Sequence, residues 1–248
     1  MVGMNFLNLD YLDQHIYRIT SQDYAVSLFT EKKNVLTQLN KLKDKFEKFL
    51  LNLGVSLNGE QGEIAFKDAF VGQCWTLASF SEAMWGIYAN DPEKRYLRLR
   101  STPRKLLMAL TEAHPCMPQD TCFIGKVKYM TEEALKEWSK NFDVTCMNVL
   151  GFANSLLLKR RAFQHEREVR LLYLGDQSSY DEGLYRYRVD PHQMITQIMA
   201  DPNRKRKEWE ADQKAIKSAT GFEGDIKRSK IYDPPDWDSP VNPTSTMS

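Results

Sequence analysis

The stretch from Lys159 to Leu174 has the sequence KRRAFQHEREVRLLYL and divides into a charged part and an apolar part. The apolar part has the length and the residue types of a compact β-strand. Side chains of a strand alternate between its two faces, so we expect Glu166 and Glu168 on one face, with Arg167 and Arg170 on the opposite one. This strand and its paired carboxylates are the starting point for both the predicted fold and the predicted site.

Two carboxylates on one strand face can serve either catalysis or structure. Neighbouring like charges are costly unless they are solvated, paired with cations or bound to a metal. Such a pair suits general-base work or the stabilisation of a cationic transition state. The structural alternative is a ladder of surface ion pairs. The Glu-x-Glu pattern by itself is compatible with both interpretations.

Further strands and helices are expected on both sides of this stretch. Alternating or apolar runs predict strands near residues 15–20, 71–77, 95–100, 122–129 and 185–189. Three- and four-residue apolar spacing and capping residues predict helices within residues 21–29, 35–53, 79–88, 102–110, 144–159, 191–199 and 204–217, and a further helix that begins at Thr131. Residues 4–14 are compatible with a short helix or an ordered lead-in. Strands and helices do not alternate regularly, so we predict an α+β domain with an N-terminal helical portion and a central mixed or antiparallel sheet.

Composition narrows the class of protein without identifying it. The 248 residues include 34 Lys and Arg against 33 Asp and Glu, so the strong basic excess of a dedicated DNA-binding protein is lacking. The four cysteines lack the short paired spacing of a zinc site. No apolar run approaches the roughly 18 residues of a membrane helix. We expect a cytoplasmic protein, with one domain over residues 1–232 and a disordered Pro/Ser/Thr-rich tail over residues 233–248.

A second candidate segment is Tyr17-Arg18, on the strand expected near residues 15–20. An arginine between apolar neighbours at this place either points to solvent or binds an anionic group at the edge of the sheet. The segment alone favours the first interpretation.

A third candidate segment is residues 74–88, CWTLASFSEAMWGIY. Ser79 and Ser81 lie at the start of a predicted helix, where backbone N–H groups and the helix dipole favour an anion such as a pyrophosphate. Both residues are also ordinary helix caps. The aromatic side chains of Trp85 and Tyr88 on this segment are typical of a core.

Together these segments resemble domain-of-unknown-function family 2971. The resemblance covers roughly residues 15–200 and rests on four pieces in the family's order: Tyr17-Arg18, LKDKFE at residues 42–47, residues 74–88, and FQHEREVR at residues 163–170. The chain departs from the family pattern in lacking the proline of the second piece and in having Cys-Trp-Thr for Cys-Phe-Ser. Because that family is similar to proteins of bacterial phage-defence and toxin loci, the resemblance implies an antiviral defence role.

The order of an arginine, a serine-bearing segment and Glu-x-Glu is also similar to ADP-ribosyltransferases of the Arg–Ser–Glu type. That similarity implies an ADP-ribosyltransferase-like fold and NAD as substrate. It implies that Glu168 stabilises an oxocarbenium-like transition state and that Glu166 orients or activates the acceptor. It implies contacts with NAD for Tyr17, Arg18, Ser79 (or Thr76 in another strand register), Ser81 and Tyr88.

Three hypotheses follow from the sequence. The first is an NAD-dependent ADP-ribosyltransferase or glycohydrolase toxin with a protein or nucleic-acid acceptor. The second is a non-catalytic binding or regulatory module of a defence or toxin–antitoxin system. In that module the two glutamates pair with Arg160, Arg161 or Arg170, and the basic segment 204–217 binds a partner protein or nucleic acid. The third is a metal-dependent nuclease, which requires Asp44, Glu47, Glu166 and Glu168 to converge.

Overall fold

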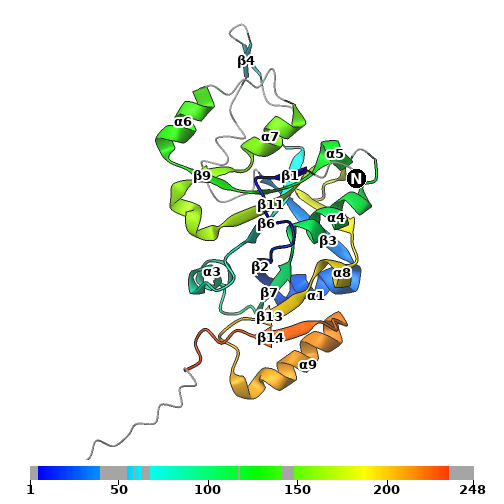
Figure 1. Cartoon of the computed structure of the whole chain (residues 1–248). Coiled ribbons are helices and arrows are strands. Elements are labelled where there is room, and N and C mark those ends of the chain that lie inside the picture. The colour runs from blue at the N-terminus through cyan, green and yellow to red at the C-terminus, as the bar shows by residue number, and fades with distance from the viewer. Residues whose placement is uncertain are drawn as a thin grey trace, which may run out of the picture.

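The chain folds around one large mixed sheet in the computed structural model, which describes residues 5–39, 55–57, 60–62, 68–116, 118–140 and 148–234. In spatial order the sheet contains β1 (Asn5–Leu7), β8 (Cys122–Lys126), β11 (Glu168–Leu174), β6 (Phe70–Thr76), β2 (Ile16–Ser21), β7 (Tyr96–Ser101), β13 (Gln197–Ala200) and β14 (Asp225–Arg228). Two edge pairs, β1 with β8 and β13 with β14, are parallel, and the other pairs are antiparallel (Figure 1). The predicted α+β class and mixed sheet are confirmed.

The sheet divides where β2 meets β6. These two strands pair only at Tyr17 and Thr76, whereas β2 pairs with β7 along its whole length. The edge of β6 beyond that point pairs instead with β3 (Lys33–Gln38), which also pairs with β12 (Leu184–Arg188). Because β2 and β6 diverge, side chains between them are not covered by a neighbouring strand. This divergence positions the candidate site described below.

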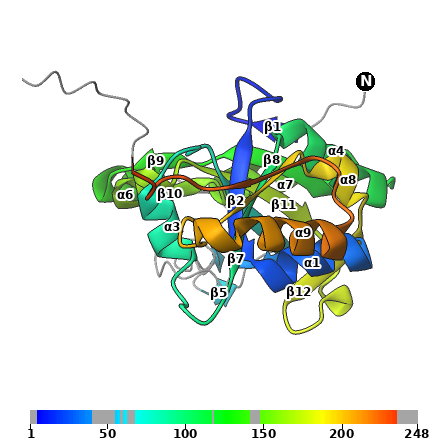
Figure 2. The same cartoon turned by 90° about the horizontal axis from the view of Figure 1, so that it is seen from below.

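Helices cover the sheet unevenly. The helices are α1 (Gln22–Glu31), α3 (Glu82–Tyr88), α4 (Pro103–Ala113), α5 (Pro118–Thr121), α6 (Glu132–Lys140), α7 (Val149–Ser155), α8 (Pro191–Met194) and α9 (Trp209–Thr220). Viewed from below, α1 and α9 lie side by side against the sheet, and the two contact each other (Figure 2). The main core lies between these helices and the sheet and includes Leu28, Leu99 and Ile198.

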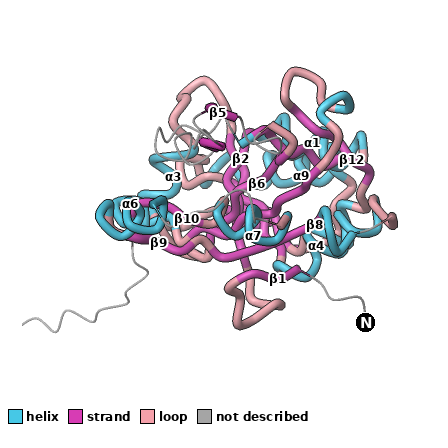
Figure 3. Tube along the Cα trace, turned by 90° about the horizontal axis from the view of Figure 1, so that it is seen from above, coloured by secondary structure: helices cyan, strands magenta, loops and turns pink. Residues whose placement is uncertain are grey.

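A second, smaller core lies at the opposite end of the molecule. It contains Phe70, Phe123 and Phe152, which are almost fully buried, and Phe70 stacks in tilted contact with both other rings. Next to it, β9 (Lys128–Met130) pairs with β10 (Leu158–Arg160) in a small parallel sheet that carries α6 (Figure 3). A further small pair joins β4 (Val55–Leu57) and β5 (Glu60–Gly62).

Local capping explains the helix boundaries that the sequence predicted. The Ser21 side chain accepts a hydrogen bond from the Tyr24 N–H, and the Thr102 side chain accepts one from the Lys105 N–H. Each cap satisfies a backbone donor that the first helical turn leaves free. At its other end, α9 stops at Gly221 with φ 62°, a left-handed conformation that favours glycine.

Four expectations for helices were wrong or only partly right. Residues 5–7 and 33–38 form strands that join the sheet, and the helix α1 lies between them in the sequence. The run expected within residues 144–159 contains α7 but ends in β10, and the run expected within residues 191–199 contains the short α8 followed by β13. Residues 40–54, which hold most of the predicted helix 35–53, lie outside the described residues.

The sequence also led to expectations about a membrane-crossing helix and about the C-terminal tail. Among the described residues no helix is long and apolar enough to cross a membrane. Asp233, the first residue of the predicted tail, forms an ion pair with Arg228. Residues 235–248 lie outside the described part of the chain, and the extents of the domain and tail stay predictions.

Candidate active site

A cavity of about 210 Å³ opens where β2 and β6 diverge. It brings together five of the predicted site residues, from three separate places in the chain: Tyr17, Arg18, Tyr88, Glu166 and Glu168. The remaining wall comes from β6 residues 72–76 and from Thr37, Ile19 and Met84. The pairing of β2 with β6 at a single position is therefore the physical reason that these distant segments share one cavity.

The two glutamates reach this cavity from a turn rather than from one continuous strand. The 3-10 helix η2 (Arg161–Glu166) ends at Glu166, and β11 begins at Glu168. Between them, Arg167 has φ 45°, in the left-handed region that non-glycine residues rarely occupy. The turn changes the chain direction, so the same-face geometry expected from simple strand alternation is replaced by a convergence of both carboxylates on one cation.

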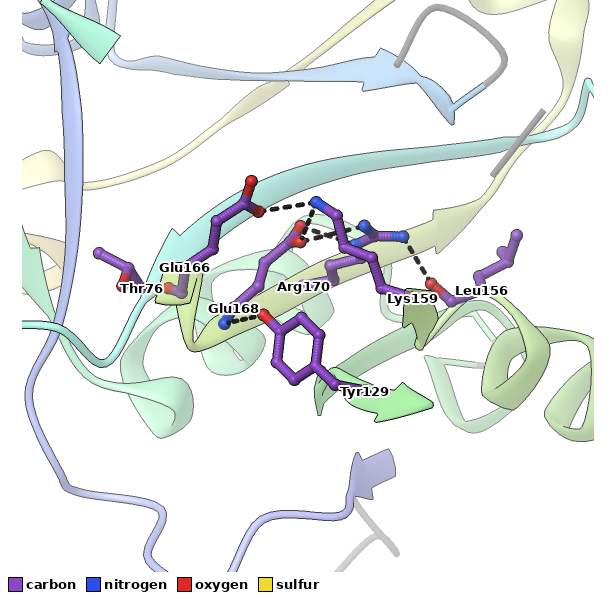
Figure 4. A network of polar contacts seen from close by, with 7 residues as sticks. All are labelled: Thr76, Tyr129, Leu156, Lys159, Glu166, Glu168 and Arg170. Atoms are coloured by element: carbon purple, nitrogen blue, oxygen red, sulfur yellow. Dashed lines mark hydrogen bonds and ion pairs between the residues drawn. The ribbon is translucent and has the colours of Figure 1, made fainter. Parts of the chain in front are cut away.

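That cation is Lys159, on β10. Its Nζ lies 2.7 Å from Oε2 of Glu166 and 3.0 Å from Oε2 of Glu168 (Figure 4). The lysine is only 7% exposed and Glu168 only 3% exposed. The glutamates therefore form buried ion pairs rather than the surface ladder that the sequence offered as the alternative to catalysis.

Glu168 is also bound by Arg170. The Nε of Arg170 donates to Oε1 of Glu168 at 2.7 Å, and its Nη2 donates to Oε2 at 3.1 Å. The same guanidinium donates through Nη1 to the Leu156 carbonyl at 2.8 Å. The expectation that Arg170 points away from Glu168 was wrong, because residues two positions apart on a strand share a face.

The backbone around Glu168 is fixed as firmly as its side chain. Its N–H donates to the Tyr129 hydroxyl at 2.8 Å. The Thr76 hydroxyl donates to the Glu166 carbonyl and accepts from the Ala78 N–H at 2.9 Å. These bonds connect both glutamates to β6 and β9, so the carboxylates lie on a framework with little freedom to move.

The surroundings shift the pKa values of the two glutamates in opposite directions. Burial acts to raise the pKa of Glu168, but the neighbouring charges of Arg170 and Lys159 outweigh it and lower that pKa to about 2. Burial raises the pKa of Glu166 despite the opposing hydrogen bond from Lys159. Glu168 is thus ionised throughout the neutral range, whereas Glu166 is the more basic of the two.

Glu166 keeps one carboxylate oxygen that no other described residue binds. Its Oε2 is bound by Lys159, and its other oxygen points away from that ammonium group (Figure 4). Both oxygens of Glu168, in contrast, accept hydrogen bonds from Arg170 and Lys159. Of the two carboxylates lining the cavity, Glu166 is therefore the better placed to contact a small molecule.

Arg18 supplies a cation on the β2 side of the cavity. Its guanidinium lies over the ring of Tyr24, with 5.3 Å from Cζ to the ring centroid. Its Nη1 is buried and has no hydrogen-bond partner among the described residues. A buried donor without a partner is unusual in proteins and fits a position that binds an anionic group.

The serines predicted to contact NAD do not line this cavity. Ser81 caps α3, where its side chain accepts from the Met84 N–H at 3.3 Å. Ser79 lines a different cavity, and its carbonyl accepts a hydrogen bond from Arg98. Thr76, which the sequence offered as the alternative to Ser79, does line the candidate site. Tyr88 forms part of its wall, whereas Trp85 is buried in the interior.

Lys159 is a member of this site that the sequence did not identify, and Arg170 was named only as one possible ion-pair partner of the glutamates. Both were visible as charged residues in the opening stretch, but charge alone does not distinguish a solvated lysine from a buried one. Burial of Lys159 depends on β10 pairing with β9, a contact between residues about 30 positions apart. Local sequence carries no signal for such a pairing.

The structure does not support a metal centre in the part of the chain that it describes. No group of three or more His, Cys, Asp or Glu side chains with metal-binding geometry occurs there. Asp44 and Glu47, two of the four residues of the nuclease hypothesis, lie outside the described residues. Glu166 and Glu168 are held by Lys159 and Arg170, whose positive charges would repel a metal cation.

Comparisons with known proteins give structural neighbours only. No family model and no curated protein matches the chain, so the resemblance to domain-of-unknown-function family 2971 is not confirmed.

Three solved structures of DarT from Thermus sp. 2.9 are similar to this chain. The complex with ADP-ribosylated ssDNA has 13% identity and a TM-score of 0.41, covering 92% of this chain and 98% of that one. The complex with NAD+ has 13% identity and a TM-score of 0.39, covering 90% and 98%. The complex with carba-NAD+ has 12% identity and a TM-score of 0.37, covering 88% and 96%. Likeness at this level does not identify an activity.

Proposed function

We propose that this chain is an NAD-consuming enzyme that transfers ADP-ribose to an acceptor, or to water. The observation that supports this most directly is that Arg18 and Glu166 line one cavity, formed where two strands diverge. One side of that cavity offers a half-buried cation, Arg18, with one buried donor that no described residue binds, and the other offers a carboxylate with an unused oxygen. A substrate that has an anionic part and another part that becomes cationic during the reaction fits these two sides. Its anionic part would meet Arg18, and the part that becomes cationic would meet Glu166.

The chemistry requires few groups. The bond between the nicotinamide nitrogen and C1′ of the ribose breaks, and the nitrogen keeps the electron pair, so that neutral nicotinamide leaves. The remaining ribose carries positive charge until the acceptor attacks C1′ and loses a proton. A fixed carboxylate stabilises the cationic transition state, and a cation holds the phosphates in place.

Each role has a candidate residue in this chain. Glu166 would place its unused oxygen beside the ribose and would accept the proton of the attacking group, which its raised pKa favours. Glu168, with both oxygens bound, would hold Lys159 and through it Glu166. Arg18 would bind a phosphate or a ribose hydroxyl, and Tyr17 and Tyr88 would form the walls around the nicotinamide half.

The size of the cavity suits part of the substrate rather than all of it. Pockets that enclose small molecules commonly measure about 300–1,000 Å³, and this one measures about 210 Å³. It therefore matches the nicotinamide ribose portion of NAD, with the adenosine portion outside.

For the biological role, we propose that the protein is a toxin or effector of a bacterial defence system and acts in the cytoplasm.

The direct test is release of nicotinamide from NAD. We expect release by the purified protein, and loss of at least about a hundredfold in rate for Glu166→Gln, because one carboxylate charge stabilises the transition state. Arg18→Ala should raise KM for NAD more than it lowers kcat. The control is Arg104→Ala, which removes an exposed arginine on α4 that pairs with Asp13.

Two negative results together would rule the proposal out. The first is absence of nicotinamide release with water, protein, RNA or DNA as acceptor. The second is failure of NAD to raise the melting temperature, since a ligand that binds only the folded state must stabilise it.

A non-catalytic binding module is the second candidate, and the saturation of Glu168 by Arg170 and Lys159 favours it. Buried ion-pair networks of this kind also occur for purely structural reasons. In that case Glu166→Gln would keep the full effect of the protein in cells while its fold stays intact. Loss of the cellular effect with an unchanged melting temperature would exclude this candidate.

A further inference from the structure

A second cavity of about 850 Å³ lies on the face of β7 and β13 that α1 and α9 leave uncovered. Its floor is formed by Arg98, Gln197 and Met199, which neighbour one another across these strands. One wall comes from Ser79 and Phe80 in the connection between β6 and α3. The other wall is formed by residues from η4 (Arg206–Glu208) to Trp209 and from β14 to Pro234.

The C-terminal segment after β14 closes one side of this cavity. From β14 the chain runs across the sheet toward α3 (Figure 2). There the Tyr232 hydroxyl donates to Glu82 of α3 at 2.9 Å, and Arg228 pairs with Asp233. The cavity is therefore defined by side-chain contacts between segments more than 100 residues apart in the chain.

The charge of the lining is strongly positive although the whole chain is almost neutral. Five cations line the cavity, namely Arg98, Arg206, Lys227, Arg228 and Lys230, and its described lining includes one carboxylate, Asp233. Asp233 is paired with Arg228. Arg206 and Lys230 are exposed and form no ion pair with any described residue. The cations come from three separate places in the chain, near residues 98, 206 and 227–230, so they are spread along the cavity instead of converging on one point.

Aromatic rings lie among these cations. Phe80 is 81% exposed, an unusual position for a phenylalanine in a loop that borders a cavity. Trp209 is half-buried, and Tyr17 lies under the guanidinium of Arg98, at 4.5 Å from Cζ to the ring centroid. An exposed ring, here that of Phe80, next to distributed cations is the combination with which proteins bind nucleotide bases and their phosphates.

We propose that this cavity binds single-stranded nucleic acid. Cations spread over several segments match a run of phosphates better than the compact phosphates of one free nucleotide. The volume of about 850 Å³ lies within the usual range for small-molecule pockets, so the spread of the cations, rather than the volume, favours a strand. Phe80 provides a ring on which a base can stack, whichever base it is.

The binding surface adjoins the candidate active site, because Tyr17 lines both cavities. A strand in the larger cavity would therefore pass close to the ribose carbon that the proposed reaction makes electrophilic. The use of the nucleic-acid strand as acceptor of ADP-ribose rests on the proposed function, but binding of the nucleic acid to the cavity does not. Binding can be measured without NAD, and nicotinamide release can be measured without a strand.

The test is equilibrium binding of fluorescently labelled oligothymidylate and oligoadenylate to the full chain without NAD. We expect binding that weakens as salt rises, with a slope of about 0.7 per phosphate contact. The double variant Arg206→Ala/Lys230→Ala should lower that slope by about 1.4, which corresponds to the loss of two phosphate contacts. Phe80→Ala should weaken binding by roughly tenfold with little change in the slope, because it removes stacking rather than charge.

The matched control removes the same charge from a surface outside the cavity. Lys214→Ala/Lys217→Ala changes two exposed lysines of α9 that do not line it, and binding by this variant should equal that of the wild type. All four substituted cations and Phe80 are exposed, so melting temperatures should stay within a few degrees of the wild type.

Three results would overturn the proposal. The first is equal weakening by the cavity variant and the control variant, which would indicate nonspecific attraction to basic residues. The second is displacement of the oligonucleotide by ADP at matching concentration, which would assign the cavity to a free nucleotide. The third is absence of binding to either oligonucleotide at low salt.

Discussion

The ammonium group of Lys159 lies between two carboxylates whose pKa values move in opposite directions. Glu168 is held ionised by Arg170 and Lys159, and Glu166 has a raised pKa because it is buried with a single cationic partner. Groups with separated pKa values in one cavity can take separate acid–base roles. At the scale of single residues, the candidate chemistry thus depends on the number of cations that each glutamate contacts.

Replacing Lys159 by methionine should strongly destabilise the protein. The substitution leaves two buried carboxylates with one cationic partner, Arg170, and breaking a buried ion pair by removing one member costs about 3–5 kcal/mol. Urea unfolding of Lys159→Met is compared with that of Lys140→Met, which removes an exposed lysine paired with Glu137. Equal losses for the two variants would show that the central ion pair contributes no special stability.

The pH dependence of stability should reveal the low pKa of Glu168. Its folded-state pKa of about 2 lies below the usual 4.5, so ionised Glu168 contributes stability above about pH 4.5. That contribution should disappear as the pH falls from about 4.5 toward 2. Unfolding free energies measured across this window should fall less steeply for Glu168→Gln than for the wild type. Parallel curves for the two proteins would contradict the assignment.

The pH dependence of NAD cleavage should reveal Glu166. Because its ionised form is the active one and its pKa is raised, the acidic limb of kcat/KM should lie above the usual range of a glutamate. Glu166→Asp should keep an acidic limb, whereas Glu166→Gln should lose it together with the activity. An acidic limb in the normal glutamate range would assign this role to another group.

At the scale of elements, one left-handed residue sets the distance between the two glutamates. Arg167 joins the end of η2 to the start of β11 with φ 45°. Local sequence predicted the strand that follows but not this turn, because arginine has no preference for the left-handed region. The same limit explains why residues 35–38, the start of the expected helix 35–53, form part of a strand instead, because pairing with β6 and β12 decides their conformation.

Substitutions at Arg167 should separate backbone strain from side-chain effects. Arg167→Gly should keep or slightly raise stability, since glycine adopts φ 45° without strain. Arg167→Val should cost about 1–3 kcal/mol and lower NAD cleavage, because a branched side chain in this region displaces both glutamates. Chemical unfolding and nicotinamide release are measured on both variants. A valine variant as stable as the glycine variant would show that the turn is not strained.

At the scale of the whole molecule, the fold brings β1, β8 and the connection between α7 and β10 together at Gly125. A Cβ on this glycine would collide with the Leu157 side chain and approach the Leu7 carbonyl to 3.0 Å. Gly86 on α3, in contrast, has no heavy atom within 4 Å of an added Cβ. The first glycine is required by packing between distant segments, and the second is not.

Alanine at these two glycines should therefore act in opposite directions. Gly125→Ala should destabilise by about 1–3 kcal/mol through overpacking. Gly86→Ala should stabilise by about 0.5–1 kcal/mol, because alanine is the better helix former. Thermal unfolding of the two variants tests both signs. A Gly125→Ala variant at least as stable as the wild type would contradict the packing at this junction.

The sequence alone determined the elements whose signals are local. Ser21 and Thr102 began helices because their side chains cap backbone donors three residues ahead, and β6, β7 and β11 have apolar patterns that any environment would bury. Only the tertiary structure decided the burial of Lys159, the partner of Arg170 and the placing of Thr76 rather than Ser79 beside the glutamates. These features depend on where strands distant in sequence pair or diverge, and no local pattern of residues encodes that geometry.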